Sequence, residues 1–260
     1  LTMTNKKFDN LFGEKPRSSE KDQITQFHMD IAASIQQVTE KAMLLLAESI
    51  RKEFNIPNLC LAGGVALNCV ANGKILKEKI FENIWIQPAA GDAGGSIGGA
   101  LAFWHIELNK DRKINPKDDM KGSYLGPEYS QKEIEEHLNS IGAKYNILAE
   151  DKIINQTSED LANGNAIGWF QGRMEFGPRA LGSRSILGDA RSSSMQKTLN
   201  LKVKYRESFR PFAPSVLRED ISEWFNFNTD SPYMLLVSNV DNRKIIQITE
   251  EQKKLFGIDK

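Results

Sequence analysis

An unusual density of arginine and glycine marks residues 172–191, GRMEFGPRALGSRSILGDAR, in which four arginines and four glycines fall within 20 positions. Glycine lets a loop curl closely around a ligand, and the planar guanidinium fork of arginine matches the oxygens of a phosphate or a carboxylate. This pattern favours an anionic small-molecule ligand. The alternative is an exposed loop whose arginines pair with neighbouring acids.

A second basic stretch, KVKYRESFRPFAPS, follows at 202–215. If it is extended, Lys204 and Arg206 lie on one face, because side chains alternate along a strand. Five cations from these two stretches are the candidate ligands for anionic oxygens: Arg173, Arg179, Arg184, Lys204 and Arg206.

The first of two glycine-rich turns ends the run NLCLAGG at 58–64 and precedes a helical pattern. A strand that ends in paired glycines and feeds a helix lets the backbone approach a ligand and aims N–H groups at it. Gly63 and Gly64 are therefore candidates for nucleotide contacts, and Asn68, one turn into the expected helix, could hydrogen-bond a ribose or a base. The alternative is a turn whose glycines serve packing alone.

The second turn, GDAGGS at 91–96, has the same construction with a carboxylate in it. Gly94 and Gly95 are again candidates for close approach to a nucleotide. Asp92 has two interpretations: its carboxylate could ligate a hard divalent metal, or it could cap the following helix by accepting orphan backbone N–H groups. Taken alone, the segment favours the cap.

Helix and strand patterns alternate around these turns, which predicts an α/β fold. Apolar residues recur at helical spacing through 22–53, and Asp22 is the expected N-cap. Strands are expected at 58–62 and 83–86, and helices at 66–77 and 91–108.

A polar stretch at 111–121 is the expected linker between a first domain, 1–110, and a second domain, 122–260. In the second domain Ser130 should cap a helix, with Glu133 completing a capping box. Helices are expected at 131–141, 151–163, 195–203 and 218–225, and strand-like runs lie at 145–148, 166–170, 212–217 and 234–240.

Bulk properties argue against several classes of protein. Basic and acidic side chains both number 34, and this balance disfavours a general nucleic-acid or membrane-surface binder. No apolar run approaches the roughly 20 residues that span a bilayer. Cys60 and Cys69 lack partners at metal-ligand spacing and are expected to be small buried residues of a cytoplasmic protein.

Five stretches in a fixed order resemble the carbamoyltransferases of the nodulation-protein and antibiotic-tailoring type, which include the O-carbamoyl-transferring enzymes of tobramycin and cephamycin biosynthesis. The stretches are LCLAGGVALNCVANGKI, GDAGGSIGGAL, YLGPEYS, GWFQGRMEFGPRALGSRSIL and KYRESFRPFAPSVL. The resemblance covers residues 30–240, and its GRMEFGPRALGSRSIL part is long and specific.

The resemblance implies two domains and a two-step reaction. The first domain would be the second lobe of an actin-like ATPase-type (ribonuclease-H-like) fold. The second would resemble the domain that synthesises threonylcarbamoyl-adenylate, and would use ATP and carbamoyl phosphate to make carbamoyl-adenylate and pyrophosphate. The first would then pass the carbamoyl group to the hydroxyl of a small-molecule or sugar acceptor. No nucleic-acid or membrane partner is implied, and the oligomeric state stays open.

Residue by residue, Gly63, Gly64 and Asn68 match the family's nucleotide-contacting turn. Asp92 matches its aspartate ligand to an iron-type divalent metal, with Mg²⁺ as an alternative ion. The five cations named above match basic positions of the adenylating domain. There they would neutralise phosphates and stabilise charge that develops at the attacked centre.

The sequence also departs from the family. The two histidines that complete the family's metal site have no counterpart, and neither the first actin-like lobe nor the end of the second domain is matched. The chain is therefore expected to be a C-terminal fragment without full turnover and with weak metal binding. Two rival functions stay open: an actin-like sugar or acyl kinase, and a non-catalytic nucleotide- or RNA-binding module with salt-sensitive RNA affinity.

Overall fold

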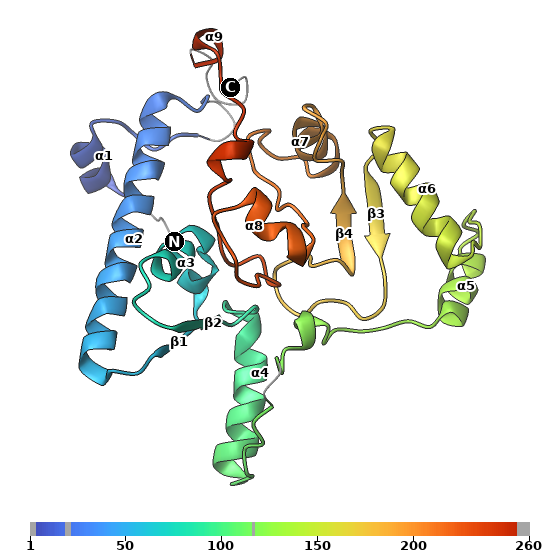
Figure 1. The fold of residues 1–260 in the computed structure, drawn as a ribbon, viewed down its shortest axis with the longest axis horizontal. Coiled ribbons are helices and arrows are strands. Elements are labelled where there is room, and N and C mark those ends of the chain that lie inside the picture. Colours follow the sequence, from blue (N-terminus) through green and yellow to red (C-terminus); the bar gives the residue numbers. More distant parts are fainter. Residues whose placement is uncertain (1–3, 19–21, 116–117, 254–260) are drawn as a thin grey trace.

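Helices and short strands alternate along the chain, and a computed structural model describes residues 4–18, 22–115 and 118–253 (Figure 1). The first half contains α1 (Lys6–Phe12), α2 (Gln26–Phe54), β1 (Asn58–Leu61), α3 (Cys69–Lys77), β2 (Asn83–Ile86) and α4 (Ala93–Ala102). The second contains α5 (Gln131–Ser140), α6 (Glu150–Ala162), β3 (Ile167–Phe170), β4 (Arg184–Leu187), α7 (Met195–Thr198), α8 (Ile221–Trp224) and α9 (Glu250–Lys253). Short 3₁₀ or π turns lie at Gly64–Leu67, Phe103–Glu107, Lys121–Ser123, Leu199–Val203, Arg218–Asp220 and Asn242–Lys244.

The parallel pair β1 and β2 brings the two glycine turns together. Leu61 lies opposite Ile86 at the carboxyl ends of the strands. Parallel strands end at a common edge of their sheet, which is where α/β proteins commonly bind ligands. The Gly63 N–H donates to the Ala90 carbonyl at 2.8 Å, so one turn is hydrogen-bonded directly to the other. Mixed helices and small sheets confirm the predicted α/β class at this coarse level.

The long helix α2 flanks this sheet (Figure 1). Its N-cap is Thr25, whose backbone N–H donates to His28 Nδ1 at 3.0 Å. The predicted cap, Asp22, is wrong, because that carboxylate accepts instead from the Ser18 N–H at 2.7 Å in the preceding turn. A small apolar core beneath α2 contains Met43, Leu44, Ala47, Leu59, Ile75 and Phe81.

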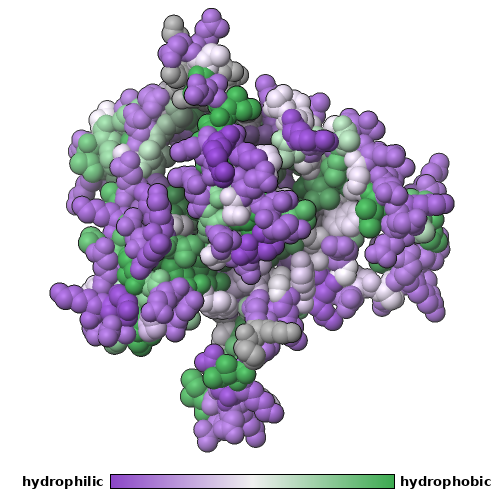
Figure 2. Space-filling view, viewed as in Figure 1, coloured by the Kyte–Doolittle hydropathy of each residue, from purple (hydrophilic) through white to green (hydrophobic). Residues whose placement is uncertain are grey.

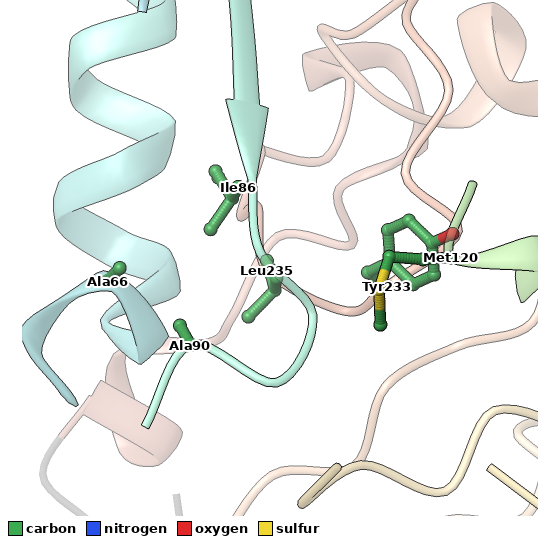
Figure 3. Packing of buried hydrophobic residues seen from close by; sticks show 6 residues of the cluster. All are labelled: Ala66, Ile86, Ala90, Met120, Tyr233 and Leu235. Atoms are coloured by element: carbon green, nitrogen blue, oxygen red, sulfur yellow. The ribbon is translucent and has the colours of Figure 1, made fainter. Parts of the chain in front are cut away.

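A second core joins the two halves of the chain (Figure 3). Its buried members are Ala66, Ile86 and Ala90 from the first half, Met120 from the end of the polar stretch, and Tyr233 and Leu235 from the second half. Asn72 of α3, which has 0% exposed surface, donates to the Ala66 carbonyl at 2.8 Å and to the Leu235 carbonyl at 3.1 Å. A fully buried amide with these two acceptors fixes the segment around residue 235 against α3. The boundary at 111–121 stays a prediction.

Several predicted elements of the second half differ in the structure. The runs 145–148, 212–217 and 234–240 form no strand, because they find no ladder partner; residue 240 makes an isolated bridge with Phe225. Near the start of the run 234–240, the Leu235 carbonyl instead accepts a hydrogen bond from Asn72 of α3. Conversely, β4 lies inside the stretch expected to be a loop and pairs antiparallel with β3.

The predicted burial of Cys60 is wrong. Residues alternate across β1, so Leu59 enters the core and Cys60 points to the exposed face. Cys69, at the start of α3, is half-buried.

Helix α4 and the π turn after it project from the body of the molecule (Figures 1 and 2). This projection exposes large apolar side chains, namely Leu101, Phe103, Trp104 and Ile106. Among the described residues, no helix combines the length and the apolar character needed to cross a membrane.

Candidate functional site

The four candidate glycines of the two turns at the sheet edge fall into two groups: those that the backbone requires and those that border open space. Gly63 has φ of +94°, which L-residues rarely adopt, and a Cβ on Gly94 would lie 2.2 Å from the Ala89 carbonyl oxygen. Gly64 and Gly95 border open space instead, since a Cβ on either would meet no atom within 4 Å. The backbone geometry therefore requires Gly63 and Gly94, whereas Gly64 and Gly95 leave room for a ligand beside the turns.

Asn68 separates the 3₁₀ turn from α3, within a stretch predicted as one helix. Its Oδ1 accepts from the Ala71 N–H at 3.1 Å and so caps α3. Its amide also exchanges hydrogen bonds with the Gln36 amide of α2, at 2.9 and 3.2 Å. The side chain predicted to contact a ribose or a base is thus engaged in joining α2 to α3.

Asp92 stands at the N-cap position of α4, but its exposed side chain makes no capping hydrogen bond. The capping alternative is therefore wrong: the backbone of Asp92 is already helical, and a cap needs extended backbone for its oxygen to reach the first N–H groups. Within the described part of the chain, no three potential ligand side chains gather as a metal site. Asp92 would give an iron-type or Mg²⁺ ion one oxygen, so the donor set here does not by itself fit a metal.

The arginine-rich loop folds around one buried carboxylate, Glu175, whose side chain is 0% exposed. Its Oε1 accepts from the N–H groups of Leu181 and Ser183, at 2.6 and 2.8 Å. Its Oε2 accepts no hydrogen bond from the described residues and lies 3.2 Å from Arg184 Nε, as an ion pair. Arg184 Nη2 donates to the Gly177 carbonyl at 2.9 Å. These contacts close a ring from residue 175 to residue 184.

Acid should loosen this ring. Burial raises the pKa of Glu175, but the surrounding backbone N–H groups, chiefly those of Leu181 and Ser183, together outweigh that effect, so the pKa lies below its usual value of 4.5. A depressed pKa stabilises the folded state above pH 4.5, and this stabilisation is lost as the pH falls through the folded-state pKa. We expect the amide protons of Leu181 and Ser183 to lose hydrogen-exchange protection as the pH falls below 4.5. In Glu175→Gln their protection should no longer depend on pH; an unchanged pH dependence would contradict the assignment.

Arg173 is held at the start of the loop by the YLGPEYS stretch. Its Nη1 donates to the Gly126 carbonyl at 2.9 Å, and its Nη2 pairs with Glu128 at 3.3 Å. Both partners of this ion pair are about half exposed. For Arg173 the structure therefore agrees with the alternative of a surface arginine paired with an acid.

Arg179 differs from its neighbours because no carboxylate of the described residues pairs with it. Its Nε is buried without a hydrogen-bond acceptor in the described part of the chain. Its Nη2 reaches the Leu67 carbonyl, at the end of the 3₁₀ turn that follows Gly63, over a long 3.4 Å. Gly177, two residues before it, would bring a Cβ within 3.4 Å of Ala89. The tip of the arginine loop thus lies close to Leu67, which follows the first glycine turn, and to Ala89, which precedes the second.

Lys204 and Arg206 do not share the extended face that the sequence predicts. The π turn at Leu199–Val203 ends at Lys204, and Tyr205 follows with φ of +48°, so the backbone bends there. Arg206 Nε donates to the buried Asn200 Oδ1 at 2.7 Å, and its guanidinium lies 4.9 Å from the ring centre of Phe212. Lys204 is exposed and forms no ion pair within the described residues.

A shallow, open hollow of about 480 Å³ lies beside Arg206, lined by Leu201, Tyr205, Arg206 and Glu207. The two basic stretches therefore offer Arg179 at the seam between the halves and Arg206 at a separate hollow. Sequence reasoning missed two buried residues that organise these stretches, Glu175 and Asn200. An acid among the arginines and glycines at the start of the stretch 172–191 was the available signal for Glu175, because a buried carboxylate needs several donors.

Comparison with known families matches both parts of the chain. Residues 1–101 match the family described as carbamoyltransferase N-terminus, and residues 158–254 match the carbamoyltransferase C-terminus. The chain belongs to the carbamoyltransferase family. This confirms the family predicted from the sequence motifs.

Relatives of this carbamoyltransferase chain occur in several bacteria. The uncharacterised protein sll1178 of Synechocystis sp. is 56% identical over 100% of this chain and 42% of its own length. The nodulation protein NolO of Bradyrhizobium diazoefficiens is 42% identical, over 85% of this chain and 40% of its own. The 3'-hydroxymethylcephem-O-carbamoyltransferase of Streptomyces clavuligerus is 32% identical, over 81% and 37%. The chain spans about two fifths of the length of these relatives.

Proposed function

We propose that this chain forms part of an O-carbamoyltransferase that makes carbamoyl-adenylate from carbamoyl phosphate and ATP and transfers the carbamoyl group to an acceptor hydroxyl. Membership of the family supports carbamoyl transfer. The name of the Streptomyces relative supports a hydroxyl acceptor for that protein. The first half would belong to an actin-like domain, and the second to a domain like the one that synthesises threonylcarbamoyl-adenylate.

The observation that carries this proposal is the position of Arg179 between the halves. A buried Nε without an acceptor is unfavourable unless a ligand supplies one, because an unsatisfied buried donor costs about 1–3 kcal/mol. Arg179 reaches Leu67 beside the glycine turns, where Gly64 and Gly95 border open space. A phosphate oxygen there would satisfy the guanidinium and could approach the backbone of the turns.

The chemistry of the proposed first step constrains what must bind. Forming carbamoyl-adenylate and pyrophosphate from carbamoyl phosphate and ATP also consumes one water and releases one phosphate, since the phosphorus atoms must balance. Water first cleaves carbamoyl phosphate into carbamate and phosphate. A carbamate oxygen then forms a bond to the α-phosphorus of ATP as the bond from that phosphorus to pyrophosphate breaks. In the second step the acceptor oxygen bonds to the carbamoyl carbon, AMP leaves, and the hydroxyl proton passes to solvent or a base.

The chain's own residues would act in this scheme by binding and charge neutralisation. Arg179 and Arg206 would hold anionic oxygens, with Lys204 as an exposed cation close in sequence to Arg206. Arg173 and Arg184 would position the loop, because their donors are engaged by Gly126, Glu128, Glu175 and Gly177. Asp92 would contribute one ligand to a divalent metal, and no step is assigned to that metal.

The deciding experiment incubates the native protein that carries this sequence with ATP and carbamoyl phosphate, and follows the products by mass spectrometry. We expect carbamoyl-adenylate and pyrophosphate, and AMP once a hydroxylated acceptor is added. Formation of ADP and a phosphorylated acceptor would support the kinase alternative instead. Salt-sensitive RNA binding, with no effect of carbamoyl phosphate, would support the binding-module alternative.

A further inference from the structure

We propose that Glu175 is a positioning residue for Arg179: its buried carboxylate shapes the loop whose tip presents the Arg179 guanidinium at the seam between the two halves. The proposal rests on the proposed function only in assigning Arg179 to anion binding. Among the described residues, Glu175 forms hydrogen bonds and an ion pair within its own loop and none with either glycine turn, so it would act through the loop.

Glu175 fixes the far side of the loop. Its Oε1 draws together the N–H groups of Leu181 and Ser183, and its charge holds Arg184. A carboxylate that accepts backbone N–H groups makes stronger hydrogen bonds than a neutral acceptor. The start of the tip is then fixed through the Gly177 carbonyl, which accepts from Arg184.

The tip of the loop, residues 178–180, has few interactions of its own. Within the described residues, no backbone–backbone hydrogen bond involves Pro178, Arg179 or Ala180. The contact from Arg179 Nη2 to the Leu67 carbonyl is 3.4 Å long, beyond the usual range for an N–H···O hydrogen bond. The guanidinium is therefore placed by the ring around Glu175 and not by its own contacts.

The ring formed by residues 175–184 also sets how closely the tip approaches Pro88 and Ala89 of the first half. Gly177 has φ of +122°, which a side chain would strain, and a Cβ there would lie 3.4 Å from both the Ala89 Cα and the Pro88 carbonyl oxygen. The tip is thus in contact with the segment between β2 and the second glycine turn. A small change in the shape of the ring would move Arg179 relative to that turn.

A double-mutant cycle on the native protein tests this inference, with pyrophosphate as the probe and calorimetry as the readout. Arg179→Ala should weaken pyrophosphate binding about tenfold or more, as expected for the loss of a charge-assisted hydrogen bond. Glu175→Gln should also weaken it, because the amide keeps the shape of the carboxylate but loses its charge opposite Arg184. The double variant should bind no more weakly than Arg179→Ala alone, since a positioning residue has nothing left to position.

Glu133→Gln is the matched control. Glu133 also accepts a backbone N–H, from Ser130 at 2.7 Å, but it caps α5 and does not contact the arginine loop. It should lower the melting temperature without changing pyrophosphate affinity. If Glu175→Gln behaves in the same way, or if its effect multiplies with that of Arg179→Ala, Glu175 is only structural and the proposal is wrong.

Three further outcomes keep the test decisive. If Glu175→Gln does not fold, Arg184→Lys replaces it in the cycle: lysine keeps the charge but cannot bridge Glu175 and Gly177 together, so the same non-additivity is expected. If the cycle behaves as expected but no carbamoyl-adenylate forms, the proposed function fails while the positioning role stands. If Arg179→Ala binds pyrophosphate normally, the positioning role fails, whatever the reaction proves to be.

Discussion

Replacing Arg179 by alanine is expected to reduce carbamoyl-adenylate formation about 100-fold, the usual effect of removing one preorganised donor from developing charge. The stability of the fold should hardly change, because Arg179 Nε has no acceptor among the described residues and its one contact, to Leu67, is long. The measurement is the initial rate of carbamoyl-adenylate formation at saturating and at limiting ATP, with thermal unfolding of the same sample.

Arg191→Ala is the control for Arg179→Ala. Arg191 lies in the same basic stretch, is 79% exposed, and pairs with Asp189, at 2.7 Å. Its removal should leave the rate unchanged, since an exposed ion pair contributes little and this arginine is already paired with an acid. Equal losses in the two variants would mean that the stretch binds anions through its overall charge and not through Arg179.

Replacing Gly73 by alanine is expected to destabilise the chain by about 3 kcal/mol, as for a severe steric conflict in a packed interior. A Cβ at this position of α3 would lie 2.4 Å from the Val237 carbonyl oxygen and 3.2 Å from its nitrogen. Backbone atoms cannot rotate away as a side chain can, so the segment around residue 237 must move off α3. Urea unfolding of the 260-residue chain measures the change.

Gly98→Ala is the matched control, because it is also a glycine-to-alanine change within a helix. A Cβ on Gly98 of α4 would meet nothing within 4 Å. Alanine should therefore stabilise the chain by about 0.5–1 kcal/mol through its higher helix propensity. A destabilisation by Gly73→Ala no larger than about 0.5 kcal/mol would show that the 233–237 segment gives way easily.

Elements that carry their own local signals could be predicted from the sequence. The capping box of Ser130 and Glu133 is confirmed at α5, and apolar periodicity located α2. Strands depend on a partner elsewhere in the chain. The runs 212–217 and 234–240 have strand-like sequences but join no sheet, and only residue 240 of the second makes an isolated bridge, with Phe225. β4 was missed for the converse reason: its pairing with β3 is invisible within its own arginine- and glycine-rich segment.

The candidate site was predictable in composition but not in arrangement. Each glycine turn follows a strand as predicted, since the strand-to-turn signal is local; the parallel pairing of the two strands was not predicted. Which arginine stays free of an acid depends on contacts across the chain: Glu128 engages Arg173, and Glu175 engages Arg184. The bend at Tyr205, which removes the shared face of Lys204 and Arg206, arises because the Arg206 N–H donates to the Asn200 carbonyl at 3.0 Å. The roles of the site residues stay predictions.

One apolar core joins the two halves of the chain and limits how the gene can evolve. It contains Ala66, Ile86, Ala90, Met120, Tyr233 and Leu235. Extra residues in the polar stretch before Met120 would disturb none of these positions. Dividing the gene there would yield two polypeptides, each with an apolar face that only the other can cover. The first would also leave the Asn72 amide without the Leu235 carbonyl. Selection should therefore keep the halves in one reading frame or have them co-produced in equal amounts.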